Sequence, residues 1–344
     1  MNRKPRLTAA ALAAPLLLAA CIGNDIPYTP AHRPVQLIMN ALLESGAAEN
    51  NVYLYLSDID TIRAVNGATV TLSVNGNVVE TGSELPQVDL PDYLDQSSLP
   101  GLVRSARYRF TTPLHPDDEV TLHAVTARGE RHATASLTVP RPVEALCVDT
   151  VQTTILYNNA SRPVTQYNIT LTDNALRSDY YRLEILHECT ACGKYGNGRD
   201  TVITWQHILP VINFDEPVLS DGRLSIGDLE GDEVDLLAEN RYNIFTDNRF
   251  AGGSYTLKVY TAPADLYPPA SMYDVTRLDR RPVVRLLTIT EAEYHYLKVL
   301  NLLAWDGFAS DLMEPLLIPS NVVGGTGFVG ASAAATVVME SARP

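Results

Sequence analysis

Short segments in which apolar and polar residues alternate constrain the fold of this chain more than any other feature. Residues 68–74 alternate with a period of two, the Asn75-Gly76 pair follows, and an apolar return segment runs through Val78 and Val79. Apolar alternation around an Asn-Gly pair is the strongest short-range signal for a β-hairpin. Further strand signals recur at turn spacings, at 52–56, 108–110, 120–125 and 133–139. About seven short strands predict an immunoglobulin-like or transthyretin-like β-sandwich over residues 35–142.

The segment Pro140-Arg141-Pro142 predicts a joint between two domains, because two prolines stop both sheet pairing and helix growth. The sequence beyond it is again rich in strand signals, at 166–173, 179–186, 201–205 and 253–260. We therefore expect a mainly β protein made of two β-sandwich-like domains, residues 35–142 and residues 143–344.

The second domain is expected to carry one helix at about residues 291–304. Thr290 and Glu293 have the spacing of a Thr-x-x-Glu capping box, which satisfies free amides at a helix start. An apolar stripe follows at Tyr296, Leu300 and Leu303. No segment after the first 20 residues reaches the roughly 18 apolar residues of a membrane-spanning helix.

The first residues of the chain are typical of an export signal. Three basic residues precede an apolar stretch from Leu7 to Ala20, which is too short to span a bilayer. The sequence Leu18-Ala19-Ala20-Cys21 closes the stretch and resembles the lipobox of bacterial lipoproteins. That resemblance implies a signal peptide over residues 1–20 and a lipidated Cys21 as the mature N-terminus; the alternative is a plain secretory signal with a coincidental cysteine.

The lipid would hold the protein at a membrane, since acyl chains such as palmitate add about 0.8 kcal/mol of binding for each buried methylene. Residues 21–34 are polar and bounded by proline, which predicts a tether. Ile22 rather than an aspartate follows the cysteine, so we expect the outer membrane. Whether the body faces the cell surface or the periplasm stays open.

The charge of the chain excludes one class of partner. Removal of residues 1–20 takes away Arg3, Lys4 and Arg6 and no acidic residue, so the net charge falls from −14 to −17. A field of this sign repels nucleic acid, so no nucleic-acid partner is expected. Solubility of an exported domain explains such a charge; attraction of cationic ligands is the alternative.

A longer set of motifs resembles one family. The sequence Asp-Tyr-Tyr-Arg-Leu-Glu-Ile at 179–185, Phe245-Thr246-Asp247, Glu314-Pro315 and the glycine-rich segment 320–331 occur in the order of the DUF4249 lipoproteins of Bacteroidota. The resemblance implies outer-membrane lipoproteins commonly encoded beside TonB-dependent receptors. It brings no catalytic residues to map.

The glycine-rich segment also matches a dinucleotide-binding fingerprint, Gly325-x-Gly327-x-x-Gly330. That chemistry needs a preceding strand, a following helix and an acidic residue about 20 positions later. Because 14 residues follow Gly330 in the sequence, we expect no such unit. The glycines are expected instead to permit tight turns or close packing between strands.

Cysteine spacing gives one weak candidate site. His187, Cys189 and Cys192 can supply three zinc ligands, and His207 a fourth. A lone Cys-x-x-Cys outside the cytoplasm more often forms a local disulfide or stays as unpaired, buried thiols, and redox activity is a third alternative. Cys147 is expected to be a buried, apolar-like side chain.

Enzyme signatures are missing from the sequence, which has no Gly-x-Ser-x-Gly elbow, no His-Glu-x-x-His and no Walker loop. The acidic residues of segment 221–235 lack the ligand order of an EF-hand, so a solvated loop is expected there. We therefore expect no cofactor and no catalysis. The leading hypothesis is an accessory of a TonB-dependent nutrient-uptake system with a glycan or peptide ligand; the alternative is a structural or adhesive surface protein of tandem β-sandwiches.

Overall fold

Strands dominate the computed structural model, as the alternation predicts. It describes residues 35–57, 62–85, 106–157, 159–174, 177–196, 198–219, 239–264, 266–268, 272–303 and 319–340. The predicted signal peptide, Cys21 and the tether lie outside these residues, as do segment 221–235 and Glu314-Pro315. Residues from Val35 onward form one compact unit.

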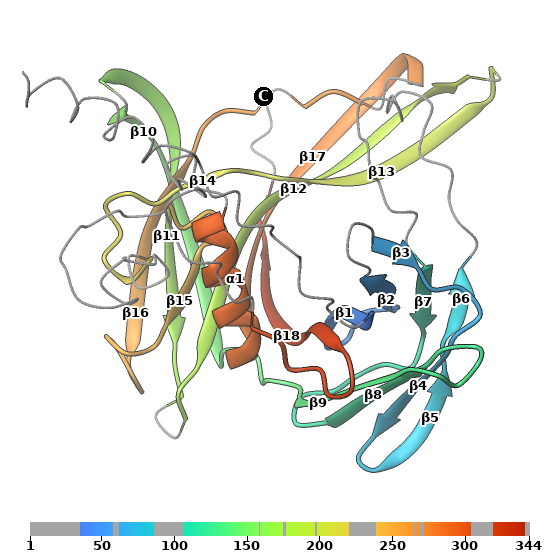
Figure 1. The fold of residues 1–344 in the computed structure, drawn as a ribbon. Helices are drawn as coiled ribbons and strands as arrows, with labels where there is room; N and C mark the ends of the chain where they lie inside the picture. Colours follow the sequence, from blue (N-terminus) through green and yellow to red (C-terminus); the bar gives the residue numbers. More distant parts are fainter. Residues whose placement is uncertain are drawn as a thin grey trace, which may run out of the picture. The chain divides into compact units, whose positions relative to one another are not determined.

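Three sheets make up this unit (Figure 1). The ten-stranded sheet is strongly curled and has the order β13-β12-β17-β18-β1-β2-β7-β6, with β15 beside β12 and β3 beside β2. The two four-stranded sheets have the orders β5-β4-β8-β9 and β10-β11-β16-β14. The strands are β1 Gln36–Glu44, β2 Asn50–Ser57, β3 Ile62–Ala64, β4 Thr69–Val74, β5 Asn77–Thr81, β6 Ser83–Leu85, β7 Ala106–Phe110, β8 Glu119–Val125, β9 His132–Thr138, β10 Ala145–Tyr157, β11 Ala160–Thr172, β12 Tyr180–Tyr195, β13 Asp200–Ile208, β14 Val211–Ile212, β15 Ile244–Thr246, β16 Ser254–Thr261, β17 Met272–Ile289 and β18 Thr326–Val338.

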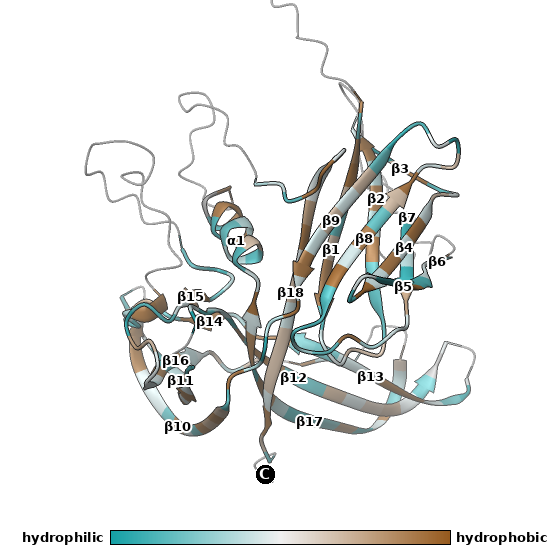
Figure 2. Ribbon diagram, turned by 90° about the horizontal axis from the view of Figure 1, so that it is seen from below, coloured by the Kyte–Doolittle hydropathy of each residue, from teal (hydrophilic) through white to brown (hydrophobic). Residues whose placement is uncertain are grey.

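The predicted hairpin is confirmed at β4 and β5. Asn75 and Gly76 both have positive φ angles, 51° and 79°. Two consecutive residues of this kind form the type I′ turn, whose twist matches that of the flanking strands. Along β4 and β8 buried and more exposed residues alternate, which Figure 2 shows as alternating hydropathy.

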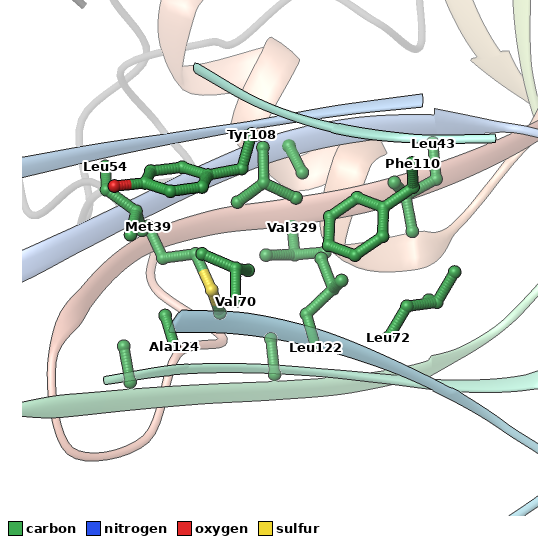
Figure 3. Close-up of a cluster of buried hydrophobic side chains, with 14 of the residues drawn as sticks. Met39, Leu43, Leu54, Val70, Leu72, Tyr108, Phe110, Leu122, Ala124 and Val329 are labelled. Carbon is green, nitrogen blue, oxygen red and sulfur yellow. The ribbon is translucent and has the colours of Figure 1, made fainter. Parts of the chain in front are cut away.

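The first core lies between the β5-β4-β8-β9 sheet and strands β1, β2, β7 and β18 of the ten-stranded sheet (Figure 3). It is built almost entirely from hydrocarbon side chains such as Met39, Leu54 and Phe110. The buried Tyr108 hydroxyl donates a hydrogen bond to the Val65 carbonyl (2.7 Å) and accepts one from the Ala68 amide (3.0 Å). The Tyr108 hydroxyl, the one phenol group of this core, therefore has both a hydrogen-bond acceptor and a hydrogen-bond donor as partners.

A second core lies between β12 and β17 of the ten-stranded sheet and strands β11 and β16. Tyr181 and Phe245 meet in it with ring centroids 5.2 Å apart. A smaller cluster packs the helix α1, Glu291–Leu303, against β15 and β17 through Tyr294 and Leu297. Both cores therefore use the same long sheet.

Strand β18 joins the two regions. It pairs in parallel with β1 and antiparallel with β17. A division into separate domains at Pro142 is consequently not confirmed, because a strand from the end of the chain completes the sheet of the first core. The junction is tight: a Cβ on Gly325 or Gly327 would lie 2.3 Å from the carbonyl oxygen of Leu37 or Met39. The glycines thus permit close packing between strands, here of β18 onto β1.

The helix is confirmed within one residue of its predicted end, whereas the capping box is wrong. The Thr290 amide donates to the Ala331 carbonyl (3.0 Å), so the strand β18 takes the bond that Glu293 was expected to make. Glu293 is instead buried, and Leu303 of the predicted stripe is 41% exposed. In the described part of the chain, no helix has the length and apolarity that crossing a membrane requires.

Candidate binding site

A cleft of about 770 Å³ opens beside the first residues of β12. Its floor comes from Arg182 to Ile185 of β12, and one wall is the connection from β13 to β14. The turn before β15 and the segment after β16 complete it. Its lining includes Tyr157, Arg182, Glu184, Ile208, Asn213, Phe214, Glu239, Asn240, Arg241 and Asn243.

The entrance of the cleft is aromatic and apolar. Tyr157 and Phe214 lie with ring centroids 5.7 Å apart, and the Arg162 guanidinium lies 6.0 Å from the Tyr157 centroid. Phe214 is 48% exposed and Ile208 is 59% exposed. Large apolar side chains that stay in water at the mouth of a concave site are typical of ligand binding.

Asparagine side chains hold the turn on the other side of the cleft. The Asn240 side-chain amide donates to the carbonyls of Leu219 and Ile244, both at 2.7 Å. Asn213 donates to the Asn243 side-chain oxygen (2.8 Å), and the Arg241 amide donates to Asn301 Oδ1 of α1 (2.9 Å). The turn is therefore fixed before any ligand arrives, which lowers the entropy cost of binding.

Arg182 and Glu184 on the floor of the cleft belong to a network of alternating charges. The network links the four elements β12, β17, β1 and α1. Arg182 bonds Glu184 at 3.0 Å, and Glu184 bonds Arg285 of β17 at 2.9 Å. Arg285 also pairs with Glu44 of β1, and Arg182 reaches Glu293 of α1 at 3.9 Å. Arg182 and Glu184 belong to both the cleft and this network.

Glu293 ends the network with an unsatisfied carboxylate. Its side chain is 3% exposed, and Oε2 has no hydrogen-bond partner among the described residues. A Cβ on Gly330 would lie 2.7 Å from that oxygen, so a larger residue at position 330 would displace the Glu293 carboxyl group. Burial raises the pKa of Glu293 to about 8, although the Arg182 charge works in the opposite direction.

Three aspartates gather at the start of β12. The Asp179 amide donates to Asp247 (2.9 Å), Arg177 donates to the Asp179 carboxylate (2.8 Å), and the Tyr181 hydroxyl donates to Asp173. Burial raises the pKa of both Asp179 and Asp247. Because a backbone amide, a guanidinium and a phenol bond these carboxylates, the cluster fixes the loops around β12.

The lining of the site combines guanidinium, carboxylate, amide and aromatic groups. Among its described residues there is no serine, cysteine or histidine. Within the described ranges, no three His, Cys, Asp or Glu side chains are grouped to hold a metal ion.

The candidate cysteine site is spread over two faces of a strand. His187, Cys189 and Cys192 all lie on β12, where residues three apart point to opposite faces. Cys189 is buried, Cys192 is partly exposed, and both are free thiols. His187 and His207 lie opposite each other on β12 and β13, and burial lowers the pKa of His187.

The expectation for Cys147 is wrong, because its side chain is exposed. Cys147 lies on the edge strand β10. The residues before and after it in this strand, Leu146 and Val148, pack against the second core. Strand alternation therefore turns Cys147 to the opposite, solvent-facing side.

Sequence reasoning missed the cleft and the charge network. A usable signal was present in Arg182-Leu183-Glu184-Ile185, where charged and apolar residues alternate inside one strand and so give β12 a charged face. Phe214 carries no such signal, since its exposure depends on contacts with distant segments.

Comparisons with known proteins agree with the motifs. The family model described as a domain of unknown function, DUF4249, matches residues 24–337. A comparison with curated proteins gives no match. The motifs 179–185 and 245–247 meet in the structure, since β15 pairs with β12. The chain belongs to the DUF4249 family.

Proposed function

We propose that this protein is a non-catalytic binding protein, held at the outer membrane by a lipid on Cys21, that takes a glycan or peptide in the cleft beside β12. It would serve as an accessory of TonB-dependent nutrient uptake. The observation that carries the proposal is the cleft of about 770 Å³, with an aromatic entrance and an amide-held turn. Clefts of this size that combine apolar walls with a few polar groups are typical ligand sites.

The chemistry of the lining favours these two ligand classes. Aromatic faces stack on sugar rings and on apolar side chains, while Arg241 and Glu239 at the rim offer charge-assisted hydrogen bonds. The Arg241 and Glu239 side chains are 47% and 73% exposed, so they are accessible to a ligand. The negative net charge also speaks against nucleic acid as the ligand.

Glycan and peptide arrays test the ligand proposal. We expect binding by the purified protein and a loss of at least about tenfold in affinity for Phe214→Ala, because roughly 1.4 kcal/mol of aromatic contact is removed. Tyr267→Ala is the matched control, since Tyr267 is an aromatic residue 76% exposed that does not line the cleft. Equal binding by wild type and Phe214→Ala would contradict the proposal.

The anchor and the partner need separate experiments. We expect Cys21→Ser to release the protein from the membrane fraction of its native host, and a tagged wild-type protein to co-purify with a TonB-dependent receptor. Absence of a receptor together with retained binding to surface or matrix material would instead favour the structural or adhesive alternative.

A further inference from the structure

The strand β13 forms an edge of the ten-stranded sheet that no second described strand covers. It is the last strand in the sheet order and pairs, among the described residues, with β12 alone (Figure 1). It is nine residues long, contains no proline, lysine or arginine, and keeps a continuous register with β12. Short length, lysine, proline and bulges are among the devices by which proteins block such edges, and β13 has none of these four.

The hydrogen-bond pattern identifies which backbone groups of β13 are free. The Leu209 amide donates to the Ile185 carbonyl at 2.8 Å, and the register continues two residues at a time through His207–His187 and Trp205–Cys189. In an antiparallel ladder the bonded residues alternate with residues whose amide and carbonyl point away. The backbone groups of Asp200, Val202, Thr204, Gln206 and Ile208 therefore face outward.

The side chains at this edge favour pairing with another strand. Val202 is 63% exposed and Ile208 is 59% exposed. β-Branched and aromatic residues supply most of the strand, and these are the residues that gain most from cross-strand contacts.

We propose that β13 pairs antiparallel with β13 of a second copy of this chain, with Thr204 on the twofold axis. This register is the one in which all nine residues overlap and every outward-facing residue meets another outward-facing residue. Ile203 then lies opposite Trp205 of the second copy, and Thr204 lies opposite its own equivalent. Aromatic–β-branched and Thr–Thr pairs are both favourable across strands.

The charged residues on and near β13 are compatible with pairing between two copies of this strand. The one acidic residue of β13, Asp200, lies opposite Ile208 in the self-paired register and meets no second acid. Neighbouring charges are already neutralised within the chain, in the pairs Glu188–Arg281, Lys194–Asp274 and Arg277–Asp279. Local repulsion between two copies is therefore small, although the whole chain is acidic.

Sedimentation equilibrium of the purified protein under reducing conditions tests the proposal. We expect the mean mass of the wild type to rise toward that of a dimer as concentration rises. Thr204→Pro removes one outward amide and leaves the bonds to β12 intact, so this variant stays monomeric. Thr204→Val keeps the amide and associates like the wild type. A wild type that stays monomeric, or a Thr204→Pro variant that still associates, would overturn the proposal; circular dichroism checks that both variants are folded.

A charge swap tests the register and the identity of the partner. Thr204→Lys and Thr204→Glu each place like charges opposite each other, so each variant alone is expected to be monomeric. Mixed together they place lysine opposite glutamate, and we expect dimer formation to return. If the mixture also stays monomeric while the wild type associates, Thr204 does not meet its own copy and the proposed register is wrong. Thr204 does not line the cleft, so failure here leaves ligand binding untouched.

Discussion

The two ends of the ten-stranded sheet bury different chemistry. At the β1–β2–β7 end the core is hydrocarbon apart from the Tyr108 hydroxyl, and among the described residues before residue 143 Asn50 is the one other polar side chain that is buried. At the β12–β17 end the buried set includes six carboxylates, from Asp173, Asp179, Glu184, Glu216, Asp247 and Glu293. The same sheet thus supports an apolar core at one end and a charged interior at the other.

This difference in buried charge distinguishes the end of the sheet that stabilises the fold from the end that carries the cleft. Buried charges cost free energy unless they are paired and hydrogen-bonded, so an interior that keeps several of them gives up stability that an apolar core would supply. The charged end is also the end that carries the cleft, with Arg182 and Glu184 common to both. We interpret the first end as the support of the fold and the second as the binding end.

The largest effect is expected at the apolar end. Phe110 is 1% exposed, so Phe110→Ala should lower the free energy of unfolding by about 3–5 kcal/mol in urea denaturation. Because β18 belongs to both regions, we expect one transition that shifts as a whole. Two separate transitions, with only one of them shifted, would show that the two ends fold independently and would restore the two-domain division.

The charged end should set the pH dependence of stability. The pKa of Glu293 is raised in the folded state from 4.5 to about 8, so the folded protein holds a proton that the unfolded chain releases as the pH rises through this range. Stability is therefore lost between pH 4.5 and pH 8. Glu293→Gln should equal the wild type near pH 4.5 and exceed it by roughly 4 kcal/mol at pH 8. Parallel curves for the two proteins would mean that burial does not raise the pKa of Glu293 in the folded protein.

Breaking the charge network comes next. Arg182→Met removes the cation that Glu184 and Glu293 share and should cost about 3 kcal/mol, since Glu184 then keeps only Arg285 as a partner and the buried Glu293 loses its contact with Arg182. Arg277→Met is the control, because its guanidinium pairs with Asp279 on the exposed face of β17 and should leave stability unchanged. Equal effects of the two substitutions in chemical denaturation would remove the distinction between buried and exposed pairs.

A smaller effect is expected where β18 joins the two ends. Gly327→Ala places a Cβ 2.3 Å from the Met39 carbonyl oxygen and should cost about 2 kcal/mol more than Gly76→Ala. Gly76 has a φ of 79°, against 116° for Gly327, and a Cβ on Gly76 would have no atom within 4 Å. Gly76→Ala therefore shows the cost of a Cβ at a positive φ in the absence of a steric contact. Equal losses in thermal denaturation would mean that β18 and β1 are less tightly packed than the structure indicates.

Local signals in the sequence predicted the local parts of this fold. The Asn75-Gly76 hairpin and the helix at 291–303 depend on neighbouring residues and are confirmed. The parallel pair of β1 and β18 joins Ile38 to Thr326, and no periodicity encodes a contact between segments so far apart. Glu293 has the spacing of a capping residue, but the Thr290 amide donates its hydrogen bond to Ala331 of β18. The Glu293 side chain therefore does not cap the helix and contacts Arg182 of the charge network. The cleft could not be predicted because its walls come from separate segments of the chain.

The carboxyl group of Glu293 offers the most direct measurement of the difference between the two ends. A carbon-13 NMR titration of glutamate-labelled protein, with Glu293→Gln to assign the signal, reports the pKa of this group in the folded state. We predict a midpoint near 8, far above the 4.5 of a solvated glutamate. A midpoint at or below 4.5 would mean that Glu293 is ionised and compensated in the folded protein, and would contradict the burial of an uncompensated acid at the β12–β17 end of the sheet.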